Sequence, residues 1–292
     1  MTNQEIYSKV TAIISDELKK GVAPWKTPYK INTPSLGRHH GINSKSAYNG
    51  INAFVTFIVA FKRGFTSARW ASFNQWRESG RFVRKGEKGS PILFFKMFER
   101  ANDKGEIEEI PLARYFNVFN ESQLEATEGL TTALPDSLPQ KKAEEIFAHS
   151  PLCNIQIISG RPAYSVTRDT VMMPKAEEFH SMDSYYSTLF HECAHATGHE
   201  SRLNRETLKA VSKFADHAYS KEELIAELTS AFLQGVCGIN GELEQSASYC
   251  ESWLKSLEND PKIFVSAASQ AQKAADYILG VKKVSTESET SH

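Results

Sequence analysis

One short motif constrains the fold of this 292-residue chain more than any other feature. The stretch FHECAHATGH contains the pattern His-Glu-x-x-His, formed by His191, Glu192 and His195. Residues four apart share one face of an α-helix, so the two imidazoles can meet one metal ion if this stretch is helical. The apolar spacing predicts a helix over about 182–197 that ends at Gly198. The alternative is a helix surface that happens to carry a cluster of histidine and glutamate.

Glu192 has a different predicted role from the two histidines. It follows His191 by one position, so it projects beside the ion rather than onto it. There it can hold a metal-bound water and accept its proton, which is the role of this glutamate in HExxH metalloproteases. The sequence therefore predicts Glu192 as the catalytic residue.

A catalytic site of this kind needs a third protein ligand. The longer pattern HExxHxxGxxH matches at Gly198 but fails at Ser201. His199 follows the glycine that ends the helix, so we expect it to turn away from the site. A glutamate from a later helix is the other common solution.

The stretch KEELIAELTSAFL supplies three such glutamates, Glu222, Glu223 and Glu227. We favour Glu227 because it lies at the edge of an apolar stripe, where a carboxylate is costly unless it meets a cation. The alternative for Glu227 is a glutamate paired with a neighbouring lysine. Two histidines and one glutamate leave the fourth position for water, which is typical of a catalytic HExxH…E site. Zn²⁺ is the preferred ion, and Mn²⁺ or Co²⁺ can occupy the same ligands.

Two further features of the second half suit peptide chemistry. The segment YSVTRDTVMMP before the motif is expected to form an edge strand that can hold an extended peptide by main-chain hydrogen bonds. His217 or Tyr219 is placed to stabilise an oxyanion. For both residues the alternative is a structural role.

The charge of the chain is divided unevenly between its halves. Residues 1–126 carry 19 Lys+Arg and 12 Asp+Glu, a net charge of +7, and residues 127–292 carry 15 and 23, a net charge of -8. This asymmetry favours a polyanionic partner for the first half. Two differently charged, solvated surfaces would give the same numbers.

Aromatic and cationic residues alternate in the basic half, as in PWKTPYK, ARWASFNQWR and RFVRKGEKG. A positive groove with flat side chains on which bases stack is typical of single-stranded nucleic-acid binding. The candidates for stacking are Trp25, Trp70, Phe73 and Trp76. The candidates for phosphate contact, beside a glycine-rich turn, are Arg84, Lys85 and Lys88. Core packing of each tryptophan, and a solvated turn, are the alternatives.

The patterns together predict an α+β chain of two domains. The first, 1–126, contains helices near 4–20 and 49–62, a short helix capped by Ser72, and a small meander sheet that includes two strands around the turn in RFVRKGEKGSPILFF. The Thr/Pro/Ser-rich stretch 127–141 reads as a linker. The second domain, 142–283, is mostly helical, with a helix capped by Ser220 and others near 244–257 and 262–279. The residues 284–292 are expected to be a disordered tail.

The cysteines and the hydropathy favour a cytoplasmic location without membrane contact. The four cysteines form no CxxC pair, and Cys193 lies inside the metal motif, where an unpaired thiol suits a reducing compartment. The N-terminal stretch is amphipathic and lacks the features of a signal peptide. The longest apolar run, INAFVTFIVAF, is too short to span a bilayer.

Several motifs in order resemble the ArdC family of antirestriction proteins. PWKTPY, YNGIN, WASFNQW, VRKGEKG and YFNVFNESQ resemble its single-strand-DNA-binding N-terminal domain. FHECAHATGHESRLNR and YSKEELIAELTSAFL resemble its zincin-like C-terminal domain. The resemblance spans about 4–280, and it is looser over 27–43 and around NSKSAYNGIN.

The resemblance implies a protein of conjugative plasmids or related mobile elements that binds single-stranded DNA and shields incoming DNA from host restriction. It implies His191, His195 and Glu227 as metal ligands, Glu192 as the catalytic-type glutamate, and DNA contacts around Tyr48 and Asn52. Two alternatives remain open. One is a DNA-coating protein with a vestigial metal site, and the other is a zinc metallopeptidase whose basic domain recruits a protein substrate or a host restriction component.

Overall fold

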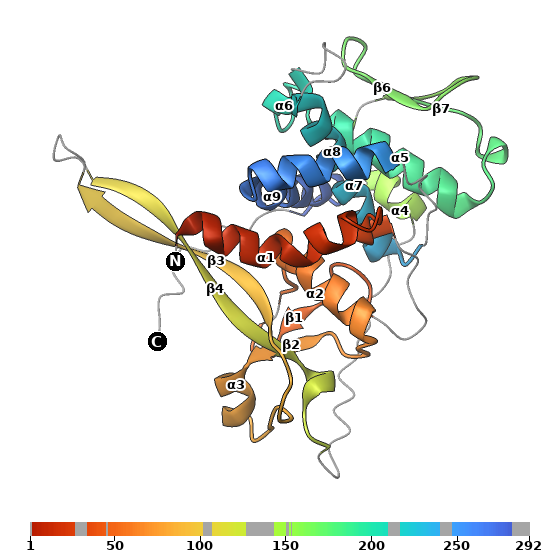
Figure 1. The fold of residues 1–292 in the computed structure, drawn as a ribbon. Coiled ribbons are helices and arrows are strands. Elements are labelled where there is room, and N and C mark those ends of the chain that lie inside the picture. The colour runs from red at the N-terminus through yellow and green to blue at the C-terminus, as the bar shows by residue number, and fades with distance from the viewer. Residues whose placement is uncertain are drawn as a thin grey trace.

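The computed structural model describes residues 2–26, 34–44, 46–101, 107–126, 143–149, 152, 154–209, 217–239 and 247–281. Figure 1 shows two α+β parts that pack against each other, each with its own small sheet. This confirms the predicted fold class. The predicted linker over 127–141 and the predicted tail over 284–292 lie outside the described residues.

The N-terminal part is built on a four-stranded sheet with the strand order β1-β2-β4-β3. Its elements are α1 (Asn3–Leu18), η1 (Pro24–Lys26), β1 (His40–Gly41), α2 (Ile51–Arg63), β2 (Arg69–Ser72), α3 (Phe73–Glu78), β3 (Ser90–Ala101), β4 (Ile107–Asn120) and η2 (Glu121–Gln123). β1 and β2 are parallel, and the other pairs are antiparallel. β3 and β4 form the long twisted ribbon that projects from the body in Figure 1.

The sheet is not the predicted meander, because β2 pairs with β4 rather than with β3. The local signals in this part were otherwise predictive with one exception. Ser72 caps α3, because its hydroxyl accepts a hydrogen bond from the backbone N–H of Gln75 at 3.3 Å. The expected strand before the glycine-rich turn does not form, and regular pairing begins only at Ser90. Within this segment Val83 makes an isolated bridge to Leu124. Two backbone hydrogen bonds flank this bridge, from Arg84 N to the carbonyl of Gln123 and from Glu125 N to the carbonyl of Phe82.

The C-terminal part is mostly helical, with a small sheet of order β5-β7-β6. Its elements are α4 (Ala143–His149), β5 (Asn154–Ile157), β6 (Ala163–Ser165), β7 (Thr170–Met173), η3 (Ala176–Glu178), α5 (Met182–Thr197), α6 (Glu206–Lys209), α7 (His217–Cys237), α8 (Ala247–Asn259) and α9 (Lys262–Ile278). The helix expected to start at Ser220 begins at His217, so Ser220 is not a cap. Its hydroxyl instead pairs with that of Ser252 at 2.9 Å.

The segment expected to be one edge strand is a hairpin. β6 and β7 are antiparallel, and the turn between them includes Asp169 at φ 45°. β7 is paired on both sides, so β6 rather than β7 lies at an edge of this sheet. Asp169 forms an ion pair with Arg202 and accepts a hydrogen bond from Tyr164, which ties the hairpin to the loop after α5.

A single apolar core runs through both parts. α1 lies between the N-terminal sheet and the helices α8 and α9, as Figure 1 shows. Phe54 of α2 packs against Phe232 of α7 with ring centroids 4.7 Å apart. Cores of this kind are as densely packed as organic crystals, so the two parts constrain each other. Among the described helices, none is both long and apolar enough to cross a bilayer.

Candidate metal centre and candidate nucleic-acid interface

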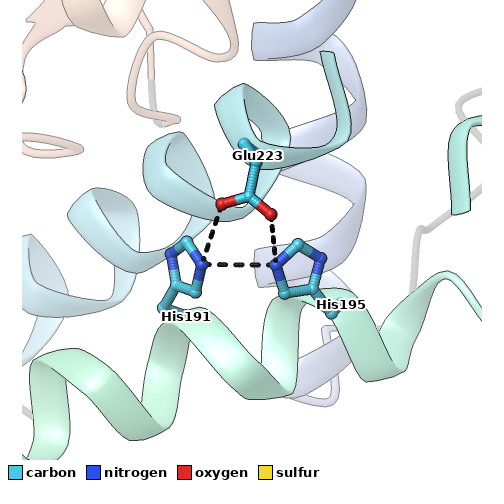
Figure 2. Close-up of side chains that lie close together, drawn as sticks. All are labelled: His191, His195 and Glu223. Carbon is cyan, nitrogen blue, oxygen red and sulfur yellow. Dashed lines mark hydrogen bonds and ion pairs between the residues drawn. The ribbon is translucent and has the colours of Figure 1, made fainter. Parts of the chain in front are cut away.

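α5 and α7 bring three potential metal ligands together (Figure 2). His191 and His195 lie one turn apart on α5, as predicted, and their Nε2 atoms are 3.2 Å apart. Glu223 approaches from α7, with Oε2 3.6 Å from Nε2 of His191 and Oε1 3.5 Å from Nε2 of His195. These residues form the group of potential metal ligands found among the described residues.

The spacing of these atoms fits a divalent ion. Bonds of about 2.0–2.1 Å in a tetrahedral Zn²⁺ site place neighbouring ligand atoms roughly 3.3 Å apart. The separation of the two Nε2 atoms, 3.2 Å, lies close to this value, and each Nε2 has one oxygen of Glu223 within 3.6 Å. Two imidazoles and one carboxylate are also a common donor set of catalytic zinc sites. Little rearrangement is therefore needed for these three residues to hold an ion.

The charges around His191 also favour a bound cation. Burial lowers its pKa, but the hydrogen bond with Glu223 and the charges of Glu227 and Glu192 outweigh burial and raise the pKa of His191 to about 9. A buried site that retains a proton so strongly is surrounded by negative charge. The same surroundings favour a metal cation, whose binding displaces the proton.

Glu227 occupies a different place from the one expected. Its Oε1 lies 2.8 Å from Nζ of Lys26 and 4.0 Å from Nδ1 of His191, on the ring edge away from Glu223. The apolar stripe does bury Glu227, which is 7% exposed, but the cation it meets is a lysine. The structure thus favours Glu223 over Glu227 as the third ligand, because the stripe alone does not determine how α7 is placed along α5.

Glu222 contacts His195 on the ring edge away from Glu223. Its Oε1 lies 3.3 Å from Nδ1 of His195 and 2.5 Å from Nη2 of Arg205, and its Oε2 accepts a hydrogen bond from Thr207. Burial raises the pKa of Glu222, but His195 and Arg205 together lower it to about 2. A carboxylate behind a metal-binding histidine fixes the ring orientation and the tautomer.

Gly198 has a packing role that the motif alone does not reveal. Its φ is -77°, which any residue adopts, so the backbone does not require glycine. A Cβ at this position would lie 2.7 Å from Nη2 of Arg205. The missing side chain leaves room for Arg205 to reach Glu222.

His199 lies where the sequence predicted, whereas the catalytic role of Glu192 stays a prediction. Glu192 is partly exposed on α5, and its charge acts on His191. His199 turns away, with Nδ1 2.8 Å from the hydroxyl of Ser201. His217 and Tyr219 lie in the first turn of α7, and their side chains fall outside the described set, so their oxyanion role stays a prediction.

Three of the four aromatic residues predicted to stack on bases are buried. Trp70 and Trp76 are 0% and 1% exposed, and Trp25 is 6% exposed. Nε1 of Trp70 donates to Nδ1 of His39 at 3.0 Å, and Nε1 of Trp76 donates to the carbonyl of Phe119 at 2.9 Å. These rings offer no face to a base. Trp70 is buried in the paired strand β2, Trp76 of α3 is bonded to β4, and Trp25 packs against Trp253 and Phe264.

Phe73 and the basic turn are accessible. Phe73 is 49% exposed at the start of α3. Lys85 and Lys88 are exposed in the turn, whereas the guanidinium of Arg84 donates to the carbonyls of Leu124 and Ser122. Arg84 therefore shapes the turn, and the two lysines remain the better candidates for phosphate contact.

Asn52 also has a structural role in this fold. Its side-chain amide both donates to the carbonyl of Leu93 and accepts from the N–H of Leu93, each at 2.7 Å, which fixes β3 to α2. Asn52 and the half-buried Tyr48 line a groove of about 730 Å³ beside the sheet.

Two phenylalanines of this groove were missed by the sequence analysis. Phe94 of β3 and Phe116 of β4 are 47% and 48% exposed and form an edge-to-face pair with centroids 5.5 Å apart. Strand register places exposed Arg114 opposite Phe94, on the same face. The sequence contains no alternation that marks this face, because Ile92, Leu93, Phe94 and Phe95 are all apolar, so the face is recognised only from the strand register.

Two family models match the chain. One describes the N-terminal domain of the anti-restriction factor ArdC and matches residues 4–119, and the other describes a zincin-like metallopeptidase and matches residues 141–270. The metal-free crystal structure of the antirestriction protein ArdC from plasmid R388 has 34% sequence identity and a TM-score of 0.75, covering 93% of this chain and 96% of that one. This chain belongs to the ArdC antirestriction family. The Mn(II)-bound structure of the same ArdC protein matches equally well, over 94% of this chain and 97% of that one.

Other relatives of this ArdC-family chain differ in length. The uncharacterized protein y4eC of Sinorhizobium fredii is 30% identical over 95% of this chain and 92% of its own length. Two DNA primases TraC of Escherichia coli are 31% and 30% identical over 92% and 97% of this chain. The ArdC-family chain spans only 19% and 28% of those primases, so the likeness does not extend to the greater part of either primase.

Proposed function

We propose that this ArdC-family protein binds single-stranded DNA along the aromatic groove of its N-terminal domain and thereby protects DNA entering the cell from restriction. The observation that carries this proposal is the pair of half-exposed phenylalanines, Phe94 and Phe116, at the wall of a groove of about 730 Å³. Large apolar side chains exposed together on a surface mark interaction sites. The family membership supplies the antirestriction context.

The lining of this groove suits unpaired bases. The two rings offer flat apolar surface, and side-chain amides of Asn43, Asn49 and Gln75 offer donors and acceptors for base edges. Stacking on aromatic rings tolerates any base and is worth about 1–3 kcal/mol per base. Bases within a duplex are already stacked on each other, so single strands are the expected ligand.

The basic turn supports binding of the backbone. It follows α3, whose first turn contributes Gln75 to the groove, and it exposes Lys85 and Lys88. The net charge of +7 over residues 1–126 adds a longer-range attraction for phosphates. Phosphates are thus expected to lie along the turn while bases enter the groove.

The test is binding of fluorescent single-stranded and double-stranded oligonucleotides to the full chain across a salt series. We expect salt-sensitive binding that prefers single strands and falls at least about tenfold in F94A/F116A. The matched control is Phe95→Ala, since Phe95 is 51% exposed but points to the opposite face of the ribbon. Equal affinity for both oligonucleotides, or equal loss in the control, would exclude the groove as the binding site.

The C-terminal domain is proposed to hold a divalent metal ion through His191, His195 and Glu223. Zn²⁺ suits this donor set, and Mn²⁺ is the ion bound in the solved ArdC relative. A bound ion would supply Lewis-acid chemistry, lowering the pKa of water and polarising a carbonyl. Glu192 is proposed to accept the proton of the attacking water, and a peptide is the substrate class that the zincin-like domain suits.

The proposed site of action is the cytoplasm of a cell that receives a plasmid or mobile element. Among the described residues, Cys193, Cys237 and Cys250 form no disulfide, which suits a reducing compartment. Because DNA binding carries the proposal, we expect host protection to survive Glu192→Gln and to fail in F94A/F116A. Transfer of unmodified plasmid into a restricting host measures both, and loss of protection in Glu192→Gln would make hydrolysis essential.

A further inference from the structure

Lys26 and Glu227 form a buried ion pair directly behind the candidate metal centre. Nζ of Lys26 lies 2.8 Å from Oε1 of Glu227, and the two side chains are 4% and 8% exposed. The same oxygen lies 4.0 Å from Nδ1 of His191, whereas Nε2 of that ring faces Glu223. A lysine of the N-terminal part is therefore separated from a proposed ligand of the C-terminal part by one carboxylate.

The fold fixes Lys26 in this position. The preceding residue, Trp25, packs against Trp253 of α8 and Phe264 of α9, with ring centroids 5.4 and 5.6 Å away. η1, which contains both Trp25 and Lys26, is thereby anchored on the C-terminal helices. A buried ammonium group is costly unless it is paired, so Lys26 also depends on the charge of Glu227.

The other histidine has the same arrangement behind it. Nδ1 of His195 faces Glu222, and Glu222 is paired with the buried guanidinium of Arg205. Both rings are thus backed by a glutamate of α7, and each glutamate is paired with a buried cation. The difference is the origin of the cation, because Arg205 lies in the C-terminal part and Lys26 in the N-terminal part.

Two buried polar atoms of the site lack hydrogen-bond partners. Among the described residues, Nδ1 of His191 and Oε2 of Glu227 are buried and make no hydrogen bond. An imidazole N–H and a carboxylate oxygen are complementary partners, and metal-binding histidines are commonly oriented by such a carboxylate. The carboxylate can act on the ring only if it is itself held in place.

We propose that Lys26 is a positioning residue of the metal centre, which holds Glu227 behind His191 so that the N-terminal domain completes the metal site. This inference rests on the proposed metal centre. It predicts that metal affinity depends on a residue outside the proposed set of ligands. It also predicts that Lys26 and Glu227 act as one unit.

The experiment measures Zn²⁺ affinity of the full-length protein by competition with a chromophoric chelator, and records the visible spectrum of the Co²⁺ form. Lys26→Met is expected to weaken Zn²⁺ binding about tenfold and to shift the Co²⁺ bands, since loss of such outer partners typically costs 10–100-fold. Lys26→Arg keeps the cation and should recover most of the affinity. Lys20→Met removes an exposed lysine of the same segment and should have no effect.

A double variant keeps the test decisive if the single one does not fold. Lys26→Met with Glu227→Met replaces a buried ion pair by apolar side chains, which is often neutral for stability. Its loss of affinity should equal that of either single variant, because each breaks the same unit.

Three outcomes overturn the inference. The first is wild-type affinity and spectrum in the folded Lys26→Met or double variant. The second is a loss in Glu227→Met far beyond that in Lys26→Met, which would make Glu227 itself a ligand. The third is the absence of His191-dependent binding in the wild type, which overturns the proposed metal centre as well and is recognised by comparison with His191→Ala.

Discussion

His39 gives the fold a specific sensitivity to acid. This residue is fully buried, and Nδ1 accepts the hydrogen bond from the indole of Trp70 at 3.0 Å. Burial is the largest influence on its pKa, and although a hydrogen bond with the Pro34 backbone acts in the opposite direction, the pKa of His39 falls from 6.5 to about 3. Protonation would leave a buried charge and remove the acceptor that Trp70 needs.

The direction of the pH effect follows from this depressed pKa. Between pH 6.5 and about 3 the unfolded chain binds a proton at this position and the folded chain does not, so stability falls as the pH falls. At pH 5 the pH lies about 1.5 units below the pKa of the unfolded histidine. The free energy of unfolding is then lower by roughly 2 kcal/mol than at pH 7.5. This value depends little on the folded pKa, provided that it lies well below 5.

The assay is urea unfolding followed by tryptophan fluorescence in the presence of a chelator, for the wild type and His39→Asn. The asparagine oxygen replaces the Nδ1 acceptor but does not titrate, and all other groups cancel in the comparison. The stability advantage of the wild type should shrink by about 2 kcal/mol between pH 7.5 and pH 5. His40→Asn, at the neighbouring half-buried position, is the matched control and should track the wild type. A difference between wild type and His39→Asn that is constant over this pH range would refute the reasoning.

Three other predictions concern the two candidate sites. Glu223→Gln should weaken Zn²⁺ binding at least about 100-fold while Glu192→Gln changes it less than about threefold, measured by chelator competition, because Glu223 faces both Nε2 atoms. Gly198→Ala should destabilise the metal-free protein by about 2–4 kcal/mol in thermal unfolding, since its Cβ displaces Arg205 from Glu222, whereas Glu200→Ala at an exposed neighbouring position should have little effect. Lys85→Ala and Lys88→Ala should each reduce the slope of log affinity against log salt by about one for single-stranded DNA, and an unchanged slope would remove the turn from the interface.

The helix that carries His191 and His195 was predictable because its signals are local. Four-residue spacing, an apolar face and a terminal glycine act within one segment, and so does the capping of α3 by Ser72. Local sequence does not determine whether Glu223 or Glu227 meets the histidines. These residues lie one turn apart on the same side of α7, and which of them meets the histidines depends on how far α7 is displaced along α5.

The exposure of the N-terminal aromatic residues was not predictable from local sequence either. Interleaved tryptophans and cations look alike whether the rings fill a core or bind bases. Trp70 and Trp76 fill the core because β2 pairs with β4 and α3 docks on β4, which are long-range contacts. Phe94 and Phe116 read as ordinary strand residues in the sequence. Their exposure depends on the tertiary structure, because both lie on the face of the β3–β4 ribbon that borders the groove.

The core that runs through both parts bears on how such chains can be rearranged during evolution. A cut between the parts would expose the apolar faces of α1 and α2 to water, so neither part is a self-contained module. The alignments with the TraC primases agree with this view, since they extend over 92% and 97% of the present chain rather than over one part of it. The two parts therefore occur together in these relatives, as they do in this chain.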